Sequence, residues 1–177
     1  VAFLAIGLLA PNSWPGEVLQ GSAIRGESIP QPSYAGMVVD GDYGEWDRAN
    51  DIFAEMYRAG DPNKDVLSKL YLRYDCDSNT LGVLVLAQSG HTIDVDAGDD
   101  EHFVKVNGAK IVDANYEPAD GAPPPDFAWI ALSPDGRTAN GWEATVALVP
   151  GTYELNVHSN MDDLQTSQVE GMGIQVE

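Results

Sequence analysis

The fold class of this chain is decided by the stretch Phe103-Val-Lys-Val-Asn-Gly-Ala-Lys-Ile-Val112. Two short apolar runs flank its central Asn107-Gly108 pair. Asn and Gly both tolerate a positive φ angle, so this pair suits the two-residue type I′ turn that joins antiparallel strands. The stretch therefore predicts a β-hairpin.

Strands of similar character recur on both sides of this hairpin. Residues 68–74 alternate, which predicts their leucines and Tyr74 on one face of a strand and Tyr71 and Arg73 on the other. Residues 50–58 fit a helix and a strand equally well. Short strands separated by Gly, Pro and Asn turns argue for an antiparallel β-sandwich, and no long helical period supports a βαβ fold. The other predicted strands are residues 81–87, 127–132, 141–148, 152–158 and 172–176.

Three regions follow from the composition along the chain. Residues 1–10 (Val-Ala-Phe-Leu-Ala-Ile-Gly-Leu-Leu-Ala) have no polar side chain, residues 11–36 are rich in Pro and Gly, and residues 37–177 carry the predicted strands. The Pro- and Gly-rich region predicts an extended arm or linker between the apolar segment and a β-sandwich domain. At ten residues, the apolar segment is too short for a membrane helix, which needs about 20, so no membrane-spanning segment is expected.

An apolar segment in so acidic a chain must be buried somewhere. Three interpretations stay open: a piece of the chain's own core, a leftover leader, or a strand donated to a neighbouring molecule. The donated strand is the working hypothesis. Its assembly residues are Val1, Phe3, Leu4, Ile6, Leu8 and Leu9.

Charge excludes one class of partner and favours another. Acidic residues outnumber Lys and Arg by 28 to 9, a formal net charge of −19. Nucleic-acid recognition needs basic clusters that this sequence lacks, whereas cations are attracted. Residues 94–101 hold five acids, the hard oxygen ligands that Ca²⁺ prefers, although a solvated acidic loop is the other interpretation. The candidate calcium ligands are Asp94, Asp96, Asp99, Asp100 and Glu101, with Asp40, Asp42 and Glu45 as a weaker second set.

Catalysis finds little support in the sequence. The three histidines have no zinc-ligand spacing, and the chain lacks both a Gly-x-Ser-x-Gly elbow and a Gly-rich phosphate loop. Cys76 is the one cysteine, so no disulfide can form within the chain. We expect no enzyme activity.

One motif resembles a known family. Residues 38–46 (Val-Val-Asp-Gly-Asp-Tyr-Gly-Glu-Trp) resemble the opening motif of family 9 carbohydrate-binding-module-like domains, in which an Asp-Gly pair precedes a Glu-Trp pair. These belong to the broader DOMON-like sandwiches of secreted bacterial proteins. The resemblance covers about residues 37–160 and implies a jelly-roll-like β-sandwich and an extracellular or cell-surface setting. It assigns no ligand, because related sandwiches bind sugars, haem, metal or nothing.

The first functional hypothesis is a non-catalytic extracellular structural subunit. It self-assembles head-to-tail by inserting its N-terminal apolar strand into a neighbouring β-sandwich, which yields a surface or matrix filament, a homopolymer. Ten residues of strand span about 33 Å, enough to cross a sandwich. Bound Ca²⁺ would offset the repulsion between the acidic subunits, so chelation is expected to weaken the assembly.

The alternative hypothesis is a carbohydrate-binding module of a secreted or surface protein. Trp129 and Tyr116 are the candidate aromatic platform for a glycan, whereas Trp142 is expected in the core and Trp46 as a plug at its end. A haem or redox sandwich is a third and weaker hypothesis. The sequence brings no pair of haem ligands together.

Overall fold

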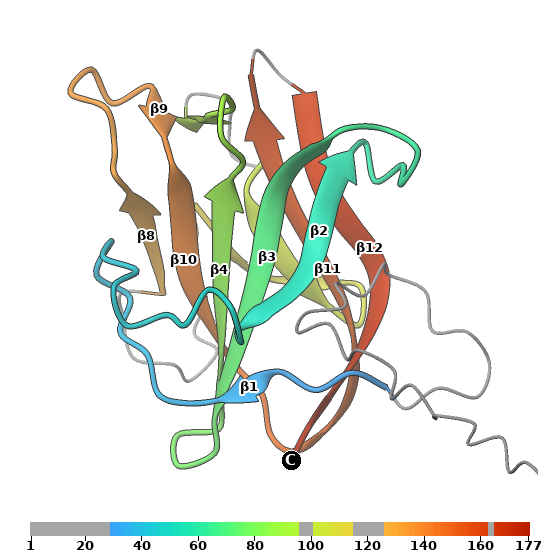
Figure 1. Cartoon of the computed structure of the whole chain (residues 1–177). Helices are drawn as coiled ribbons and strands as arrows, with labels where there is room; N and C mark the ends of the chain where they lie inside the picture. The colour runs from blue at the N-terminus through green and yellow to red at the C-terminus, as the bar shows by residue number, and fades with distance from the viewer. Residues whose placement is uncertain (1–28, 96–100, 115–125, 163–164) are drawn as a thin grey trace, which may run out of the picture.

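The computed structural model describes residues 29–95, 101–114, 126–162 and 165–177, and these form an all-β molecule (Figure 1). The prediction of an all-β, antiparallel fold is confirmed. The strands are β1 (Ser33–Tyr34), β2 (Ile52–Arg58), β3 (Val66–Asp75), β4 (Thr80–Ala87), β5 (Ile93–Asp94), β6 (Phe103–Val106), β7 (Ala109–Asp113), β8 (Phe127–Ile130), β9 (Thr138–Ala139), β10 (Gly141–Ala147), β11 (Gly151–Met161) and β12 (Gln165–Val176).

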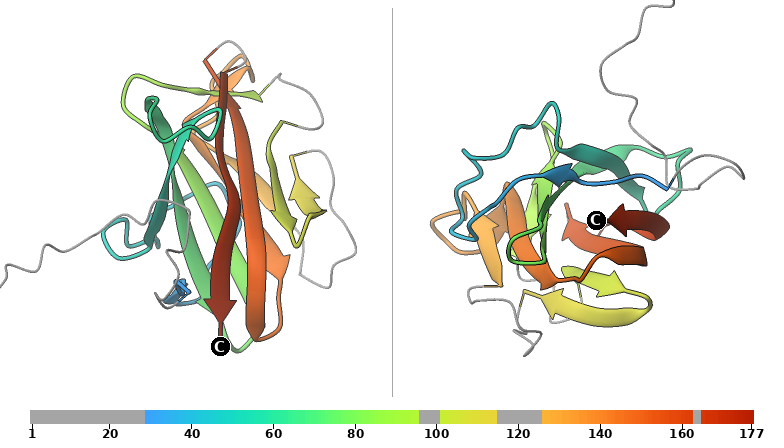
Figure 2. Two further views of the ribbon diagram at one scale, coloured as in Figure 1. Left: turned by 90° about the vertical axis from the view of Figure 1, so that its right-hand side faces the viewer. Right: turned by 90° about the horizontal axis from the view of Figure 1, so that it is seen from below.

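One hydrogen-bonded path connects the longer strands, in the order β7-β6-β11-β12-β2-β3-β4-β10-β8, with every neighbouring pair antiparallel. Seen from below, the path curls around a central interior (Figure 2). β7 and β8 are its two ends, and the short β5 bridges β11 to β9. The sheet is therefore nearly closed.

The path has one short joint. β2 and β12 share only two register pairs, Ser167 with Arg58 and Gln168 with Tyr57. All other junctions of the path have more. This joint divides the path into a β7-β6-β11-β12 group and a β2-β3-β4-β10-β8 group.

The predicted hairpins form where the sequence placed them. Asn107 and Gly108 have φ angles of 50° and 80° and join β6 to β7. The region 50–58, which the sequence left open, is the strand β2. β8 ends at Ile130, two residues earlier than predicted, because Ala131 takes a φ angle of 49° and leaves the extended conformation.

The main core fills the interior of the curled sheet. Trp142 is fully buried there, as predicted, together with the inward leucines of β3 and Tyr74. Tyr71 and Arg73, on the opposite face of β3, are also buried. A strand that is buried on both faces needs a second covering layer.

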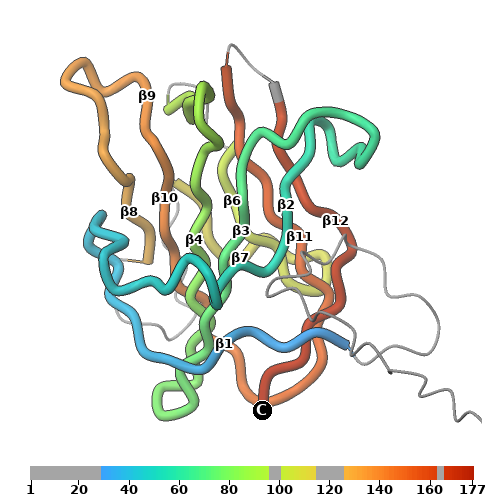
Figure 3. Tube along the Cα trace, in the orientation of Figure 1, coloured from blue at the N-terminus to red at the C-terminus, as the bar shows by residue number. Residues whose placement is uncertain are grey.

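That layer is the N-terminal strap, the name used here for residues 29–51. It pairs with β3 through β1, crosses in front of β4, β10 and β8, and turns back to β2 (Figure 3). A second, smaller core lies under it, and Trp46 is buried in this core rather than at the end of the main one. Its buried members are Trp46, Tyr71, Leu84 and Ile130, with Met37, Tyr43, Ile52 and Leu86 packed around them.

Residues 29–36, which the sequence assigns to the arm, lie along the body. Ser33 and Tyr34 pair in parallel with Arg73 and Tyr74, and Gln175 donates its main-chain N–H to the carbonyl of Pro30 at 3.0 Å. Residues 1–28, and with them the rest of the predicted arm, lie outside the described residues. No helix long and apolar enough to cross a bilayer occurs in the described ranges.

Candidate functional site

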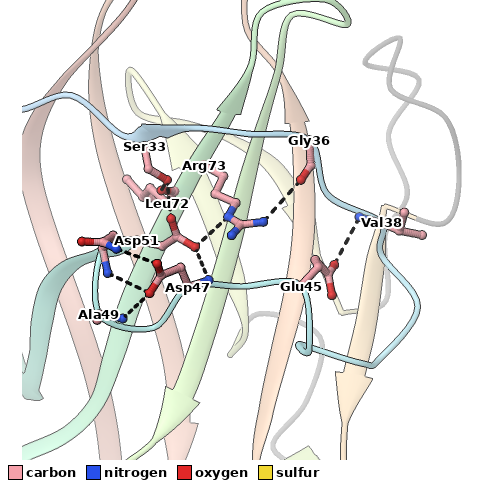
Figure 4. Close-up of polar contacts among 10 residues, drawn as sticks. Ser33, Gly36, Val38, Glu45, Asp47, Ala49, Asp51, Leu72 and Arg73 are labelled. Atoms are coloured by element: carbon pink, nitrogen blue, oxygen red, sulfur yellow. Dashed lines mark hydrogen bonds and ion pairs between the residues drawn. The ribbon is translucent and has the colours of Figure 1, made fainter.

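A buried ion pair clamps the N-terminal strap to β3 (Figure 4). Arg73 Nε lies 2.6 Å from Asp51 Oδ2, and Asp51 is only 4% exposed. The same carboxylate accepts hydrogen bonds from the Ser33 hydroxyl at 2.6 Å and from the Asp47 N–H at 2.7 Å. Arg73 also donates to the Gly36 carbonyl at 3.4 Å. Residues from the first and the last part of the strap thus contact one ion pair.

A second anchor lies on β10. Glu143 is fully buried, and its Oε1 accepts the main-chain N–H groups of Asp40 and Gly41 at 2.6 and 2.7 Å. Burial raises the pKa of Glu143 although these two hydrogen bonds lower it. A Cβ on Gly41, whose φ angle is 83°, would lie 2.8 Å from the Trp129 carbonyl oxygen. The Asp-Gly turn of the motif is therefore seated on β10 and β8.

The side chains of the weaker calcium set accept hydrogen bonds from the main chain. The side chains of Asp40, Asp42 and Glu45 accept the N–H groups of Asp42, Gly44 and Val38, respectively. Across the described ranges, no three His, Cys, Asp or Glu side chains are grouped to hold a metal ion. These acids stabilise the turn.

The main calcium candidate is described only at its two ends. The Asp94 carbonyl accepts a hydrogen bond from His102 Nε2 at 2.8 Å, and the Glu101 carbonyl accepts one from His158 Nδ1 at 2.9 Å. Two histidines thus hold the two ends of the acidic segment through its main chain. Neither contact could be read from the sequence, where these histidines have no recognisable spacing. Asp96, Asp99 and Asp100 lie outside the described residues.

His102 is a neutral, structural imidazole. Since its Nε2 donates to a carbonyl, its Nδ1 is an acceptor in the neutral ring and lies 3.2 Å from the Ser159 hydroxyl. Trp142 Nε1 donates to that same hydroxyl at 3.1 Å. Burial lowers the pKa of His102 to about 4. This chain of contacts connects β10 and β11 to β5 through the interior.

The ends of the path, β7 and β8, border what we call the seam. Both strands lack a second neighbour in the described part of the chain. Ile111 of β7 and Phe127 and Trp129 of β8 pack against the main core but are only partly buried. Within the described ranges, the seam therefore has an apolar rim and two strand edges with no neighbouring strand.

Trp129, the described member of the predicted glycan platform, lies in an aromatic cluster. Its ring contacts His102 and Phe127 edge-to-face, with centroid separations of 5.1 and 5.0 Å. Tyr116 lies outside the described residues. The same is true of the predicted assembly residues Val1, Phe3, Leu4, Ile6, Leu8 and Leu9.

A hollow of about 270 Å³, open to solvent, lies on the outer face of β6, β11 and β12. We call it the outward pocket. Phe103 and His158 stack there with centroids 4.9 Å apart, and Lys105 Nζ lies 4.4 Å from the Phe103 centroid. The sequence analysis missed this site, because its strands are neighbours only after folding. The polar and aromatic residues that line it are Phe103, Lys105, Asn156, His158, Gln168 and Glu170.

Comparison with known protein families, with curated proteins and with solved structures finds no match to this chain. The resemblance of residues 37–160 to carbohydrate-binding-module-like domains thus remains an expectation from the sequence. The strap, the seam and the outward pocket are the described features that bear on function.

Proposed function

We propose that this chain is a non-catalytic extracellular structural subunit. It assembles head-to-tail by donating residues 1–10 to the seam between β7 and β8 of a neighbouring copy. The observation that carries the proposal is the seam itself, where the curled path stays open in the described part of the chain.

Strand edges with no neighbouring strand in the described ranges favour the addition of a strand. They present rows of main-chain N–H and C=O groups, which pair readily with another chain. The partly buried Ile111, Phe127 and Trp129 supply apolar surface beside those edges. Each Leu, Ile or Phe of a donor strand that becomes fully buried contributes about 1.5–3 kcal/mol. A donor strand would satisfy both the edges and the rim.

The strap provides a firm base for such a donor. Asp51, Arg73 and Glu143 fix it to β3 and β10. From Ile29, residues 11–28 can span at most about 60 Å when extended, which is enough to reach another copy. A contact of this kind does not close on itself and gives a filament.

The jelly-roll-like sandwich is part of the same proposal. The two strand groups of the path, joined by two register pairs between β2 and β12, correspond to the two sheets of a sandwich. Calcium at Asp94–Glu101 belongs to it too, as the cation that offsets the repulsion between subunits of charge −19. Filaments that persist unchanged in EDTA at low salt would remove calcium from the proposal.

The direct test is electron microscopy of the full chain and of a variant lacking residues 1–10. We expect filaments only from the full chain. Filaments from both, or from neither, contradict the proposal.

Cross-linking tests the acceptor. In a Cys76→Ser background, Ile6→Cys and Ala109→Cys are made in separate chains, mixed and treated with a short bismaleimide. Ala109 is exposed on β7, so the two chains should link. Asn63→Cys, exposed in the turn before β3, replaces Ala109→Cys as the control and should not link. A chain that carries both Ile6→Cys and Ala109→Cys and links only within itself would show that the segment folds back.

The alternative, a carbohydrate-binding module, is favoured by a different observation. Trp129 is engaged edge-on by two aromatic rings. The outward pocket instead combines an aromatic pair with hydrogen-bonding side chains.

A further inference from the structure

The outward pocket is a shallow hollow on an open face of the sheet, where one small ring could rest. Its volume of about 270 Å³ includes open solvent, so a bound ring would keep one side exposed. It opens on a sheet face that the N-terminal strap does not cover, since the strap crosses β3, β4, β10 and β8. A ligand can therefore enter without any movement of the strap.

A β-bulge shapes the floor of the pocket. The β11–β12 register shifts between Leu155 and Val157. At this point Glu170 and Gly171 of β12 lie opposite the single residue Asn156 of β11, and Gly171 has a φ angle of 63°. Asn156 Oδ1 accepts the Gly171 N–H at this point. Since the amide oxygen is engaged, the Nδ2 group of Asn156 remains as a donor, and it has no partner among the described residues. Bulges commonly redirect a side chain toward a site in this way.

The aromatic wall also presents an unused acceptor. His158 Nδ1 donates to the Glu101 carbonyl, so Nε2 carries the lone pair in the neutral ring. No described residue donates to that nitrogen. The ring is held flat against Phe103, with 6° between the two planes. Its position is therefore fixed by a stack and a hydrogen bond.

The remaining polar groups of the pocket include both hydrogen-bond donors and acceptors. Gln168 Nε2 donates to Glu170 Oε1 at 3.0 Å, which leaves Gln168 Oε1 as an acceptor. Lys105 contributes an ammonium group over the Phe103 ring and forms no ion pair within the described ranges. The pocket thus offers donors on Asn156 and Lys105 and acceptors on His158, Gln168 and Glu170.

From this arrangement we propose that the outward pocket binds one pyranose ring of a saccharide. A sugar hydroxyl both donates and accepts, so it matches a lining in which donors and acceptors are mixed. An inorganic anion would need converging donors, whereas the lining of this pocket includes one lysine and one carboxylate. This inference rests on the alternative function above and is independent of filament assembly.

The test uses the full chain and saturation-transfer difference NMR, which observes the ligand and works for monomers and filaments alike. The probes are the methyl glycosides of glucose, mannose, galactose, N-acetylglucosamine and glucuronic acid, with inorganic phosphate tested in parallel by equilibrium dialysis. We expect at least one glycoside to bind at millimolar concentration.

Two variants locate the binding. Asn156→Asp keeps the acceptor for Gly171 N–H and removes the Nδ2 donor, and His158→Asn keeps a donor for the Glu101 carbonyl and removes the Nε2 acceptor. Each should weaken binding about tenfold, the loss of about one hydrogen bond. Thr152→Ala, exposed on the same strand β11, is the matched control and should leave binding unchanged.

Three results would overturn the inference. They are the absence of binding by every glycoside, equal binding by the wild type and both variants, and binding of phosphate alone. None of them bears on the electron microscopy of the truncated chain, so the two proposals fail separately.

Discussion

The two outer faces of the curled sheet differ in what covers them. On the β3, β4, β10 and β8 face, the N-terminal strap buries Tyr71 and Leu84 in a second core. On the β6, β11 and β12 face, Lys105, Asn156 and His158 occupy the equivalent outward positions and remain partly exposed. Both faces come from strands with one side in the main core. The difference shows that the layer above a strand, rather than the strand, decides the fate of its outward residues.

A pair of cations allows the comparison to be made directly. Arg73 lies over the Trp46 ring at 5.2 Å on the covered face, and Lys105 lies over the Phe103 ring at 4.4 Å on the open face. Arg73 is also paired with Asp51 and buried, whereas Lys105 has no carboxylate partner among the described residues. The two cations should therefore contribute unequally to the free energy of unfolding.

The largest effect is expected for Arg73→Leu. Removing one partner of a buried ion pair leaves the Asp51 carboxylate uncompensated, so the free energy of unfolding should fall by about 3–5 kcal/mol. Urea denaturation measures it. Arg58→Leu is the control, because its pair with Asp65 at 3.3 Å is solvent-exposed and contributes at most about 1 kcal/mol. Equal losses from the two variants would show that the strap is not clamped as described.

The second effect lies in the interior that both faces share. The folded protein keeps His102 neutral, with a pKa lowered from 6.5 to about 4 by burial. Its stabilising contribution is complete above pH 6.5 and is lost as the pH falls to about 4, a change of about 3 kcal/mol. His102→Gln, which retains a donor for the Asp94 carbonyl, should lose this part of the pH dependence. Glu143, whose raised pKa acts in the opposite direction, is common to both chains, so the difference between their unfolding curves isolates His102.

The third effect compares two glycines with positive φ angles. Gly41→Ala and Gly108→Ala share the conformational cost of a side chain in that region, about 1–2 kcal/mol. Only at Gly41 would the new Cβ meet another atom, the Trp129 carbonyl at 2.8 Å, while nothing lies within 4 Å at Gly108. Gly41→Ala should therefore destabilise by about 1–3 kcal/mol more. Equal thermal unfolding of the two variants would place the strap turn away from β8.

The smallest effect is expected on the open face. Lys105→Gln removes a cation over an aromatic ring that is partly exposed, so the loss in unfolding free energy should be about 0.5–1 kcal/mol. Chemical denaturation of Lys105→Gln and Arg73→Leu under the same conditions gives the ratio of their losses in unfolding free energy. A loss as large as that of Arg73→Leu would mean that Lys105 has a structural role comparable to the clamp.

Much of the sheet could be predicted from local patterns. Asn107-Gly108 gave the hairpin, and the alternation in β3 and β10 placed Leu70, Leu72 and Trp142 inside, because a strand with one buried face has a period of two. The alternation also placed Tyr71 on the opposite face, but it could not show that this face is buried, because the strap that covers it comes from another part of the chain. β12 was predicted only from residue 172, because its first residues are polar and are recruited by the neighbouring strands β11 and β2.

The sites were harder to predict than the strands. Asp51 and Arg73 are 22 positions apart, and the Phe103–His158 stack exists because β6 pairs with β11. Such contacts depend on the order of strands in the sheet, which no local pattern contains. Most of the predicted assembly and calcium residues lie outside the described ranges, so strand donation and calcium binding stay predictions from the sequence.

The short joint between β2 and β12 has a mechanical consequence. Because two register pairs connect the strand groups there, a change in their mutual angle disturbs few hydrogen bonds. At the opposite side of the path, the short β5 links β11 to β9. If residues 1–10 are donated to the seam as proposed, so few hydrogen bonds at the joint should let donor strands that differ in side-chain size be tolerated better than donor strands that differ in polarity.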